Sequence, residues 1–303
     1  MKNKICLITG ANSGIGKAAA AGLAELGATV VLTCRNEEKG ERAISEIRKE
    51  TANGELYSLP ADLSSQKSVR QLAENFRSQF QQLHVLISNA ATFYTKLHYS
   101  VDGIEMQFAV NHLSHFLLTN LLLDVIKQSA PARIINVASN AHFGGKINFD
   151  DLNHEKNYDG RRVYAQSKLA NVLFTYELAR RLEGTGVSAN CLHPGVVRTG
   201  IGNKHSSGII KLGWLLWKPF MISTEKGAEK IIYLASSGEV EGISGKYFEN
   251  CQAKSSSKLS CDRELARRLW TVSEKLTGCI RSGEVLSNSA FNIIEKSLAF
   301  ILF

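Results

Sequence analysis

Thr9-Gly10-Ala11-Asn12-Ser13-Gly14-Ile15-Gly16 is the segment from which the fold of this chain can be predicted. It follows the apolar run Ile5-Cys6-Leu7-Ile8, which is typical of a buried parallel strand, and leads into an alanine-rich helical pattern at residues 17–26. In order, its three glycines permit a tight turn, a close approach of the backbone to a pyrophosphate, and close packing of the helix on the strand. The free amides of the helix start favour phosphate, so the segment predicts a dinucleotide site.

Strand and helix patterns alternate from this turn onward. Further strands are predicted at residues 29–33, 55–59, 85–88, 133–137, 188–192 and 245–248. Helices are predicted at residues 37–50, 65–80, 102–127, 163–182 and 224–235. The alternation predicts an α/β fold with a doubly wound, Rossmann-type parallel sheet of about seven strands in three α/β/α layers.

Composition favours one soluble domain. The chain has 303 residues, 44% of them hydrophobic, and only four prolines, and no Pro/Gly/Ser-rich linker divides it. We therefore expect a single dinucleotide-binding and catalytic domain over residues 1–280. The formal charge is +8, but Lys and Arg are spread among acids, so a basic surface that attracts an anionic cofactor is favoured over nucleic-acid binding.

The cysteines and the N-terminus bear on the compartment. The six cysteines, at positions 6, 34, 191, 251, 261 and 279, form no metal-ligand spacing, so no metal site is expected. The first strand begins about five residues after the start, which leaves no room for a secretory signal, and free thiols fit a reducing compartment. The cytoplasm is the expected location.

Tyr164 and Lys168, in Tyr164-Ala165-Gln166-Ser167-Lys168, lie one helical turn apart far downstream of the glycine turn. A phenol with a pKa of about 10 transfers protons poorly at neutral pH unless a nearby cation lowers that pKa. Such a spacing alone usually marks a solvated helix face. Behind a dinucleotide turn, it predicts an enzyme that transfers hydride.

Seven motifs recur in an order that identifies a family. They are the turn at residues 9–16, Asp62-Leu63, Asn89-Ala90, Val110-Asn111-His112, Val137-Ala138-Ser139, Tyr164 with Lys168, and Pro194-Gly195. From about Lys4 to about Leu276 the chain resembles the short-chain dehydrogenases/reductases, most closely the retinol-dehydrogenase-like branch. The order of motifs is specific for fold and reaction type, and much less so for substrate.

The resemblance implies four catalytic residues. Tyr164 would protonate the carbonyl oxygen, or deprotonate the alcohol in reverse, while the nicotinamide exchanges hydride with the carbon. Lys168 would lower the phenol pKa and hold the nicotinamide ribose, and Ser139 would stabilise the developing charge on the same oxygen. Asn111 would position a water for proton relay through the lysine.

The resemblance also implies the cofactor contacts. They are Gly10, Asn12, Ser13, Gly14, Ile15, Gly16, Asp62, Leu63, Asn89, Ala90, Tyr164, Lys168, Pro194, Gly195, Val197 and Thr199. Asp62 would meet the adenine amino group, Asn89 would brace the central strand, and Thr199 would contact the nicotinamide amide. The strand at 29–33 is followed by Cys34-Arg35 instead of an acid, so a 2'-phosphate and hence NADP(H) is expected. Lys17 either adds positive field or is simply an exposed helix residue.

Two alternatives stay open. The run Ser88-Asn89-Ala90-Ala91 lacks the final glycine usual in the family, which puts the local loop geometry in question, and it is similar to the protochlorophyllide reductases. The spacing of 25 positions between Ser139 and Tyr164 favours the retinol-dehydrogenase-like interpretation over that one. The second alternative is a non-catalytic NADPH-binding regulatory or scaffold protein of the same fold.

Two apolar segments bear on the partner. Residues 200–223 contain two tryptophans and are expected to form either a substrate lid or a membrane contact, with core packing as the plain alternative. Residues 281–303 end in an apolar tail too short to span a bilayer. We expect a lipophilic carbonyl or alcohol substrate, and peripheral membrane contact and a homodimer stay open.

Overall fold

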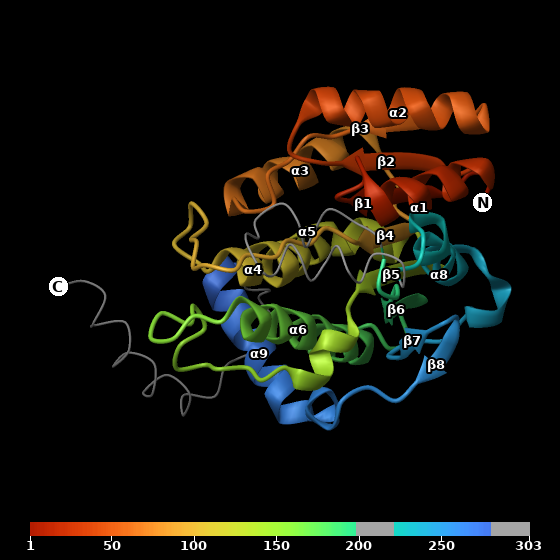
Figure 1. Ribbon diagram of the computed structural model, residues 1–303. Helices are drawn as coiled ribbons and strands as arrows, with labels where there is room; N and C mark the ends of the chain where they lie inside the picture. Colours follow the sequence, from red (N-terminus) through yellow and green to blue (C-terminus); the bar gives the residue numbers. More distant parts are fainter. Residues whose placement is uncertain (198–220, 280–303) are drawn as a thin grey trace.

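The computed structural model describes residues 1–197 and 221–279, and these form one doubly wound sheet flanked by helices (Figure 1). The eight strands are β1 (Ile5–Thr9), β2 (Thr29–Thr33), β3 (Leu56–Ser58), β4 (Val85–Ser88), β5 (Ala132–Val137), β6 (Val187–His193), β7 (Tyr247–Glu249) and β8 (Gln252–Lys254). Their order is β3-β2-β1-β4-β5-β6-β7-β8. The predicted Rossmann-type fold is confirmed, with one strand more than expected.

The additional strand β8 is the only antiparallel one among the described elements. It pairs with β7 through Phe248 opposite Ala253, and its three residues are all exposed. A short, polar edge strand has no apolar run, so the sequence carries no pattern that would reveal it.

Two helical layers cover the sheet. Helices α1 (Gly14–Glu25), α2 (Glu37–Thr51) and α8 (Thr224–Ser236) pack on one face around Ile8, Leu32 and Ile231. Helices α3 (Gln66–Gln79), α5 (Ser114–Gln128) and α6 (Gly160–Arg181) pack on the other around Leu86 and Phe116. Because both faces are covered, the central strands are buried at nearly every position, and β1 and β4 are mainly apolar.

The helix predicted at 102–127 begins later, at Met106, and contains a π-helical turn. Helix α4 (Met106–Phe108) continues through a π-helical turn, η1 (Ala109–Leu113), into α5. Within the described residues, 106–128 is the one helical stretch long and apolar enough to cross a membrane, and 78% of its apolar window is buried inside the protein. It is therefore the core helix of the second layer, and its π turn carries Asn111.

The C-terminal helix α9 (Arg263–Thr277) was not expected from the sequence. It is amphipathic, and its apolar residues include Leu269 and Trp270, which pack against α6 (Figure 1). The 3-10 turn η6 (Lys258–Cys261) precedes it, and Asp262 caps it by accepting from the amides of Glu264 and Leu265. Its buried residues Ala266, Leu269, Trp270 and Ser273 recur at helical spacing, a pattern that the sequence analysis overlooked.

Leu269 tests how much α9 contributes to stability. Leu269 is 1% exposed, and Leu269→Ala removes a fully buried side chain, so we expect a loss of about 3 kcal/mol in the free energy of unfolding. Leu259, in η6, is 42% exposed, and Leu259→Ala should cost under about 1 kcal/mol. Urea unfolding of both variants measures the difference. Equal losses would show that α9 packs less tightly than the contacts indicate.

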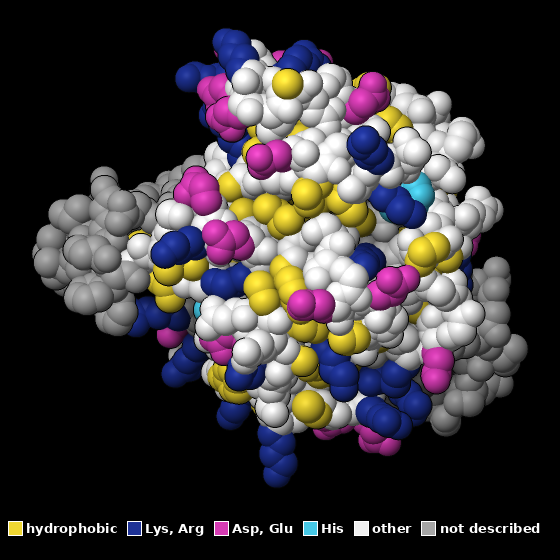
Figure 2. Space-filling view, turned by 90° about the vertical axis from the view of Figure 1, so that its right-hand side faces the viewer, with side chains coloured by type: hydrophobic (Ala, Val, Ile, Leu, Met, Phe, Trp, Pro, Cys, Tyr) yellow, Lys and Arg dark blue, Asp and Glu magenta, His cyan; other side chains and the backbone are white. Residues whose placement is uncertain are grey.

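Several expectations fall outside the described residues. The lid interpretation for residues 200–223 concerns a segment of which only 221–223 are described, and the tail at 281–303 lies wholly outside. Cys6, Cys34, Cys191, Cys251 and Cys261 are free thiols, and the described ranges contain no cluster of three His, Cys, Asp or Glu suited to a metal. On the face shown in Figure 2, basic and acidic side chains are interspersed, and basic ones gather along its lower part.

Candidate active site

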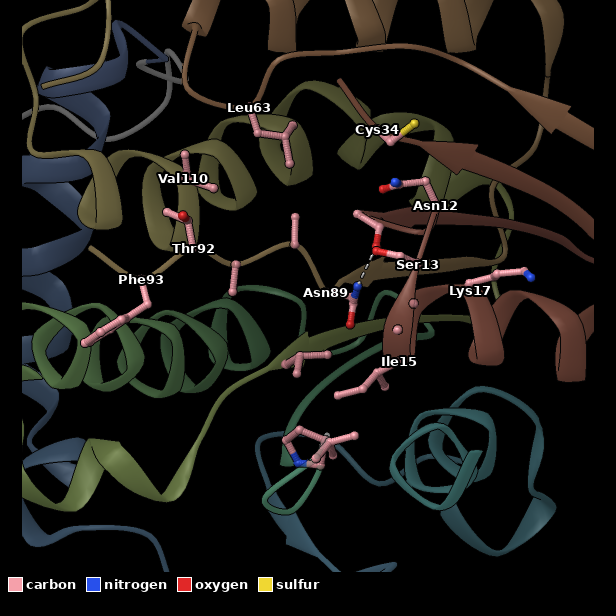
Figure 3. A pocket seen from close by; sticks show the side chains of 18 of the residues that line it. Asn12, Ser13, Ile15, Lys17, Cys34, Leu63, Asn89, Thr92, Phe93 and Val110 are labelled. Carbon is pink, nitrogen blue, oxygen red and sulfur yellow. Dashed lines mark hydrogen bonds between the residues drawn. The ribbon is translucent and has the colours of Figure 1, made fainter. Parts of the chain in front are cut away.

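A cavity of about 1460 Å³ opens at the carboxyl ends of the parallel strands. It lies where the strand order reverses between β1 and β4, the place at which open α/β sheets bind ligands. Figure 3 shows Asn12, Lys17 and Cys34 toward one end and Thr92, Phe93 and Val110 toward the other. Apart from Asn111, every predicted site residue in the described ranges lines this cavity; Thr199 lies outside those ranges.

The glycine turn forms one wall of the cavity. Gly10 has φ +66°, and a Cβ on Gly16 would lie 2.5 Å from both the Asn89 side chain and the Gly10 carbonyl. Both positions therefore require glycine. Ser13, the N-cap of α1, makes no side-chain cap bond, and the first turn of α1 has no acid. The amides at this helix start suit the pyrophosphate of a dinucleotide.

Asn89 ties the end of β4 to the glycine turn. Its Nδ2 donates to Thr9 O at 2.9 Å and to Gly10 O at 3.2 Å, which fixes β1 against the loop after β4 (Figure 3). Ala91 stands where the family usually has glycine, and it does not adopt a positive φ. The loop therefore needs no glycine there, and the question that the sequence raised about its geometry is answered.

The end of the cavity beside β2 and α2 is basic. Arg35 lines it together with Lys39 and Arg42 of α2, two residues that sequence analysis did not identify. Lys17 Nζ donates to Glu46, and Arg42 Nε donates to the same carboxylate at 3.0 Å. The outcome lies between the two expectations for Lys17: its side chain lines the cavity, but its charge is paired with Glu46. Lys39 and Arg42 lie about one turn apart on α2, a spacing visible in the sequence.

Asp62 and Leu63, which follow β3, line the same end. The Asp62 carboxylate accepts from the Ser64 amide at 3.0 Å and from the Ser64 hydroxyl at 2.8 Å. These bonds hold the Asp62 side chain at the cavity wall. A carboxylate has further acceptor capacity beyond these two bonds, which suits an adenine amino group.

Ser139, Tyr164 and Lys168 meet in the central part of the cavity. Ser139 follows β5, and Tyr164 and Lys168 lie on one face of α6. The ammonium nitrogen of Lys168 lies 5.6 Å from the centre of the Tyr164 ring and donates to Val137 O at 2.9 Å. Phe93 packs edge-on against Tyr164 with ring centres 5.8 Å apart. Two chain segments, the end of β5 and helix α6, thus present a hydroxyl, a phenol and an amine to one space.

Asn111 lies beside this group instead of facing the cavity. Its Oδ1 accepts from the Thr92 amide at 2.7 Å, and its Nδ2 donates to Thr92 O and to the Ser167 hydroxyl, each at 3.0 Å. The side chain therefore joins the loop after β4 to α6. This geometry gives the side chain a bracing role that the water-relay expectation did not include.

The wall at the opposite end of the cavity is apolar. Phe93, Tyr94, Met106 and Val110 line it, and each is only partly buried. Gln107 holds this wall in place, because its Nε2 donates to Tyr94 O at 3.3 Å and to Gly160 O at 3.1 Å. Sequence analysis missed these residues, since the loop at 91–105 has no motif of its own.

The chain is similar to known proteins over most of its length. The family model for short chain dehydrogenases matches residues 4–209. The chain belongs to this family. It is 46% identical to retinol dehydrogenase 14 of Homo sapiens over 297 residues, covering 93% of this chain and 88% of the relative. It is 47% identical to retinol dehydrogenase 12 of Mus musculus over 275 residues, 91% of this chain and 86% of that one.

Solved structures agree as well. The RhlG/NADP active-site complex of Pseudomonas aeruginosa has a TM-score of 0.66 and 27% identity, covering 82% of this chain and 94% of that one. An uncharacterized protein from Mycobacterium Paratuberculosis has a TM-score of 0.73 and 34% identity, with coverage of 91% and 94%. This short-chain dehydrogenase is thus an oxidoreductase of a family that uses a nicotinamide cofactor, and it is retinol-dehydrogenase-like.

The protonation of the Tyr164–Lys168 pair differs from the sequence expectation. Burial raises the pKa of Tyr164 to about 12, and the hydrogen bond from Ser139 opposes this only in part. Burial lowers the pKa of Lys168 to about 7. With these pKa values, Lys168 loses its proton at a lower pH than Tyr164 does. Contrary to the expectation from the sequence, the lysine therefore does not lower the pKa of the phenol in this structure. The spacing in the sequence predicts only that the lysine charge and the phenol are close enough to attract each other. The desolvation that shifts both pKa values depends on the surrounding packing.

Lys168 of this dehydrogenase should therefore affect stability in a pH-dependent way. Its folded-state pKa is depressed to about 7, so the unfolded chain binds the additional proton between that pH and its unperturbed pKa of 10.5. Burying Lys168 therefore destabilises the protein most near pH 7 and progressively less toward pH 10.5. The stability of Lys168→Met relative to wild type should fall by a few kcal/mol as pH rises across this window.

Calorimetry of both proteins without cofactor at pH 7 and pH 9.5 measures this trend. Lys226→Met, on α8 at the surface, is the matched control and should show no such trend. A stability difference for Lys168→Met that is the same at both pH values would contradict a strongly depressed lysine pKa.

Proposed function

We propose that this dehydrogenase is an NADPH-dependent carbonyl reductase that also works in reverse as an alcohol dehydrogenase. Its substrate would be a hydrophobic aldehyde, ketone or alcohol of retinoid, fatty-aldehyde or steroid-like type. One observation carries the proposal: a single cavity joins a basic dinucleotide cradle, the group of Ser139, Tyr164 and Lys168, and an apolar wall. Along the cavity, these three regions would hold the adenosine, the nicotinamide and the lipophilic substrate, in that order.

The cofactor fits the residues present. The cavity of about 1460 Å³ is large enough for a dinucleotide with a substrate beside it, and the space next to Gly10 and Gly16 is open because they lack a Cβ. When bound, the nicotinamide supplies or accepts the hydride. Lys168 would hold the nicotinamide ribose, and Pro194, Gly195 and Val197 line the same cavity.

Proton transfer falls to Tyr164. Because its pKa is about 12, the phenol is protonated at neutral pH and ready to donate to the oxygen of a carbonyl that is being reduced. The Ser139 hydroxyl can donate a hydrogen bond to the same oxygen and stabilise its negative charge. Lys168 would replenish the proton, since an amine with a pKa of about 7 gains and loses protons at neutral pH.

The expected preference for NADP(H) is supported by charge. Arg35, Lys39 and Arg42 line the adenosine end, and within β2 and the two residues after it there is no acid to bind a ribose 2'-hydroxyl. Arginine matches the geometry of a phosphate and forms strong charge-assisted bonds with it.

The lipophilic substrate is supported by the wall of Phe93, Tyr94, Met106 and Val110 and by the retinol dehydrogenases among the relatives. Apolar walls with few polar groups bind lipophilic ligands. The intact group of Ser139, Tyr164 and Lys168 favours an enzyme over a scaffold that only binds the cofactor.

Loss of NADPH absorbance with the purified protein tests the proposal. A panel of retinal, long-chain aldehydes, steroid ketones and small polar carbonyls should show turnover of the lipophilic members, with NADPH preferred over NADH. Turnover of only the small polar members would contradict the substrate class. Tight NADPH binding with no turnover of any member would favour the non-catalytic alternative.

A further inference from the structure

His142 contacts the carbonyl of Ser139 twice. In the 3-10 turn η2 (Asn140–Gly144), its backbone amide donates to Ser139 O at 3.0 Å, and its ring Nδ1 lies 2.7 Å from the same oxygen. On the other side of the ring, Nε2 accepts from the Ser257 amide at 3.1 Å. Since Nε2 accepts, the ring proton lies on Nδ1, and the imidazole is neutral and donates to Ser139 O.

The ring is held from several sides. His142 is fully buried, and it stacks near Tyr247 of β7 with ring centres 4.9 Å apart. The Tyr247 hydroxyl donates to Asn140 Oδ1, and the Asn140 amide donates to Glu249. The turn after β5 is thereby fixed to β7 and to the segment before η6, both more than a hundred residues later in the chain.

These contacts determine how Ser139 is presented. Ser139 has φ −164° and ψ 154°, and its hydroxyl oxygen accepts from the Ala141 amide at 3.2 Å. The carbonyl is held by His142 and the hydroxyl by the turn that His142 belongs to, so the peptide plane and the side chain are fixed together. A change of ψ at Ser139 would break the bond from Nδ1 and turn the hydroxyl away from Tyr164.

We propose that His142 is a positioning residue that holds the Ser139 hydroxyl in the orientation needed for hydride transfer. It acts through Ser139 and does not touch the reacting oxygen. The inference rests on the proposed function of Ser139 and extends it to a residue on which none of the family motifs falls. It also gives the segment around Ser257 a role, because that segment sets the ring orientation.

Two isosteric variants separate the two bonds of the ring. In His142→Asn, the amide nitrogen can occupy the place of Nδ1 and keep the bond to Ser139 O. In His142→Gln, the longer amide reaches the place of Nε2 and keeps the bond from Ser257 but loses the one to Ser139. Each variant loses one hydrogen bond, so their losses of stability should be similar.

We expect His142→Gln to lower kcat about tenfold, the loss of one well-placed hydrogen bond, with the NADPH Kd changed less than about twofold. His142→Asn should keep at least about half of the wild-type kcat. In the protein without cofactor, the amides of residues 142 and 145 should exchange hydrogen faster in His142→Gln only. His84→Asn, which removes a buried ring that accepts from the Ile5 amide at 3.1 Å, is the structural control and should leave kcat unchanged.

Ser139→Ala makes the test specific. In the Ser139→Ala background, His142→Gln should have less than about a twofold further effect, because the group it positions is gone. The same tenfold loss in both backgrounds would overturn the proposal, as would wild-type kcat in His142→Gln. If Ser139→Ala itself leaves kcat unchanged, the proposed function of Ser139 fails instead. Should His142→Gln not fold, a kcat for His142→Asn as low as that of Ser139→Ala would overturn the inference.

Discussion

Tyr164→Phe is expected to lower kcat about a thousandfold while leaving the NADPH Kd within about threefold of wild type. The variant removes only the phenolic hydroxyl, and the ring keeps its edge-on contact with Phe93. The hydroxyl is the group whose protonated form, with a pKa of about 12, can donate to the carbonyl oxygen. Stopped-flow measurement of NADPH oxidation with retinal, together with fluorescence titration of NADPH, separates the two effects.

Tyr176→Phe is the matched control for this variant. It removes another tyrosine hydroxyl from α6, one bonded to the Ser256 hydroxyl at 2.7 Å and absent from the cavity wall. It should cost stability but keep kcat within about twofold. If Tyr164→Phe kept more than a tenth of the wild-type kcat, another group would have to donate the proton, and the assignment of Tyr164 would be wrong.

Arg35→Ser should raise the KM for NADPH about 10- to 100-fold and leave the KM for NADH nearly unchanged. A charge-assisted bond to a phosphate contributes about 1.5–3 kcal/mol, and each 1.4 kcal/mol is a factor of ten. NADH lacks the 2'-phosphate, so it has no such bond to lose. Steady-state kinetics with both cofactors and one saturating carbonyl substrate measure the change.

Arg48→Ser, on the exposed side of α2 and away from the cavity wall, is the control for Arg35. It should not change either KM. Lys39→Ser should give a smaller rise for NADPH than Arg35→Ser, because lysine acts on a phosphate as a point charge without a paired fork. Equal effects of Arg35→Ser on NADPH and NADH would show that Arg35 binds a part of the cofactor that the two share.

The predicted strands of the sheet agree with the structure closely at β2 and β4 and within a few residues elsewhere. Each of these segments is identified by a local pattern, an apolar run between turn residues, that does not depend on distant parts of the chain. Helix α9 and strand β8 are the elements that were missed. Strand β8 is short and polar and offers no such run, whereas α9 has apolar residues at helical spacing and could have been predicted.

The sequence by itself determined the fold and most of the motif residues that gather at the site, because the ends of successive parallel strands must meet at one edge of the sheet. Only the tertiary structure decided how those residues behave. It sets the shifted pKa values of Tyr164 and Lys168. It also makes the bracing bonds of Asn111 and the hold of His142 on Ser139. The reason is physical: desolvation and buried hydrogen bonds arise from segments packed together across long sequence distances, and local patterns do not record them.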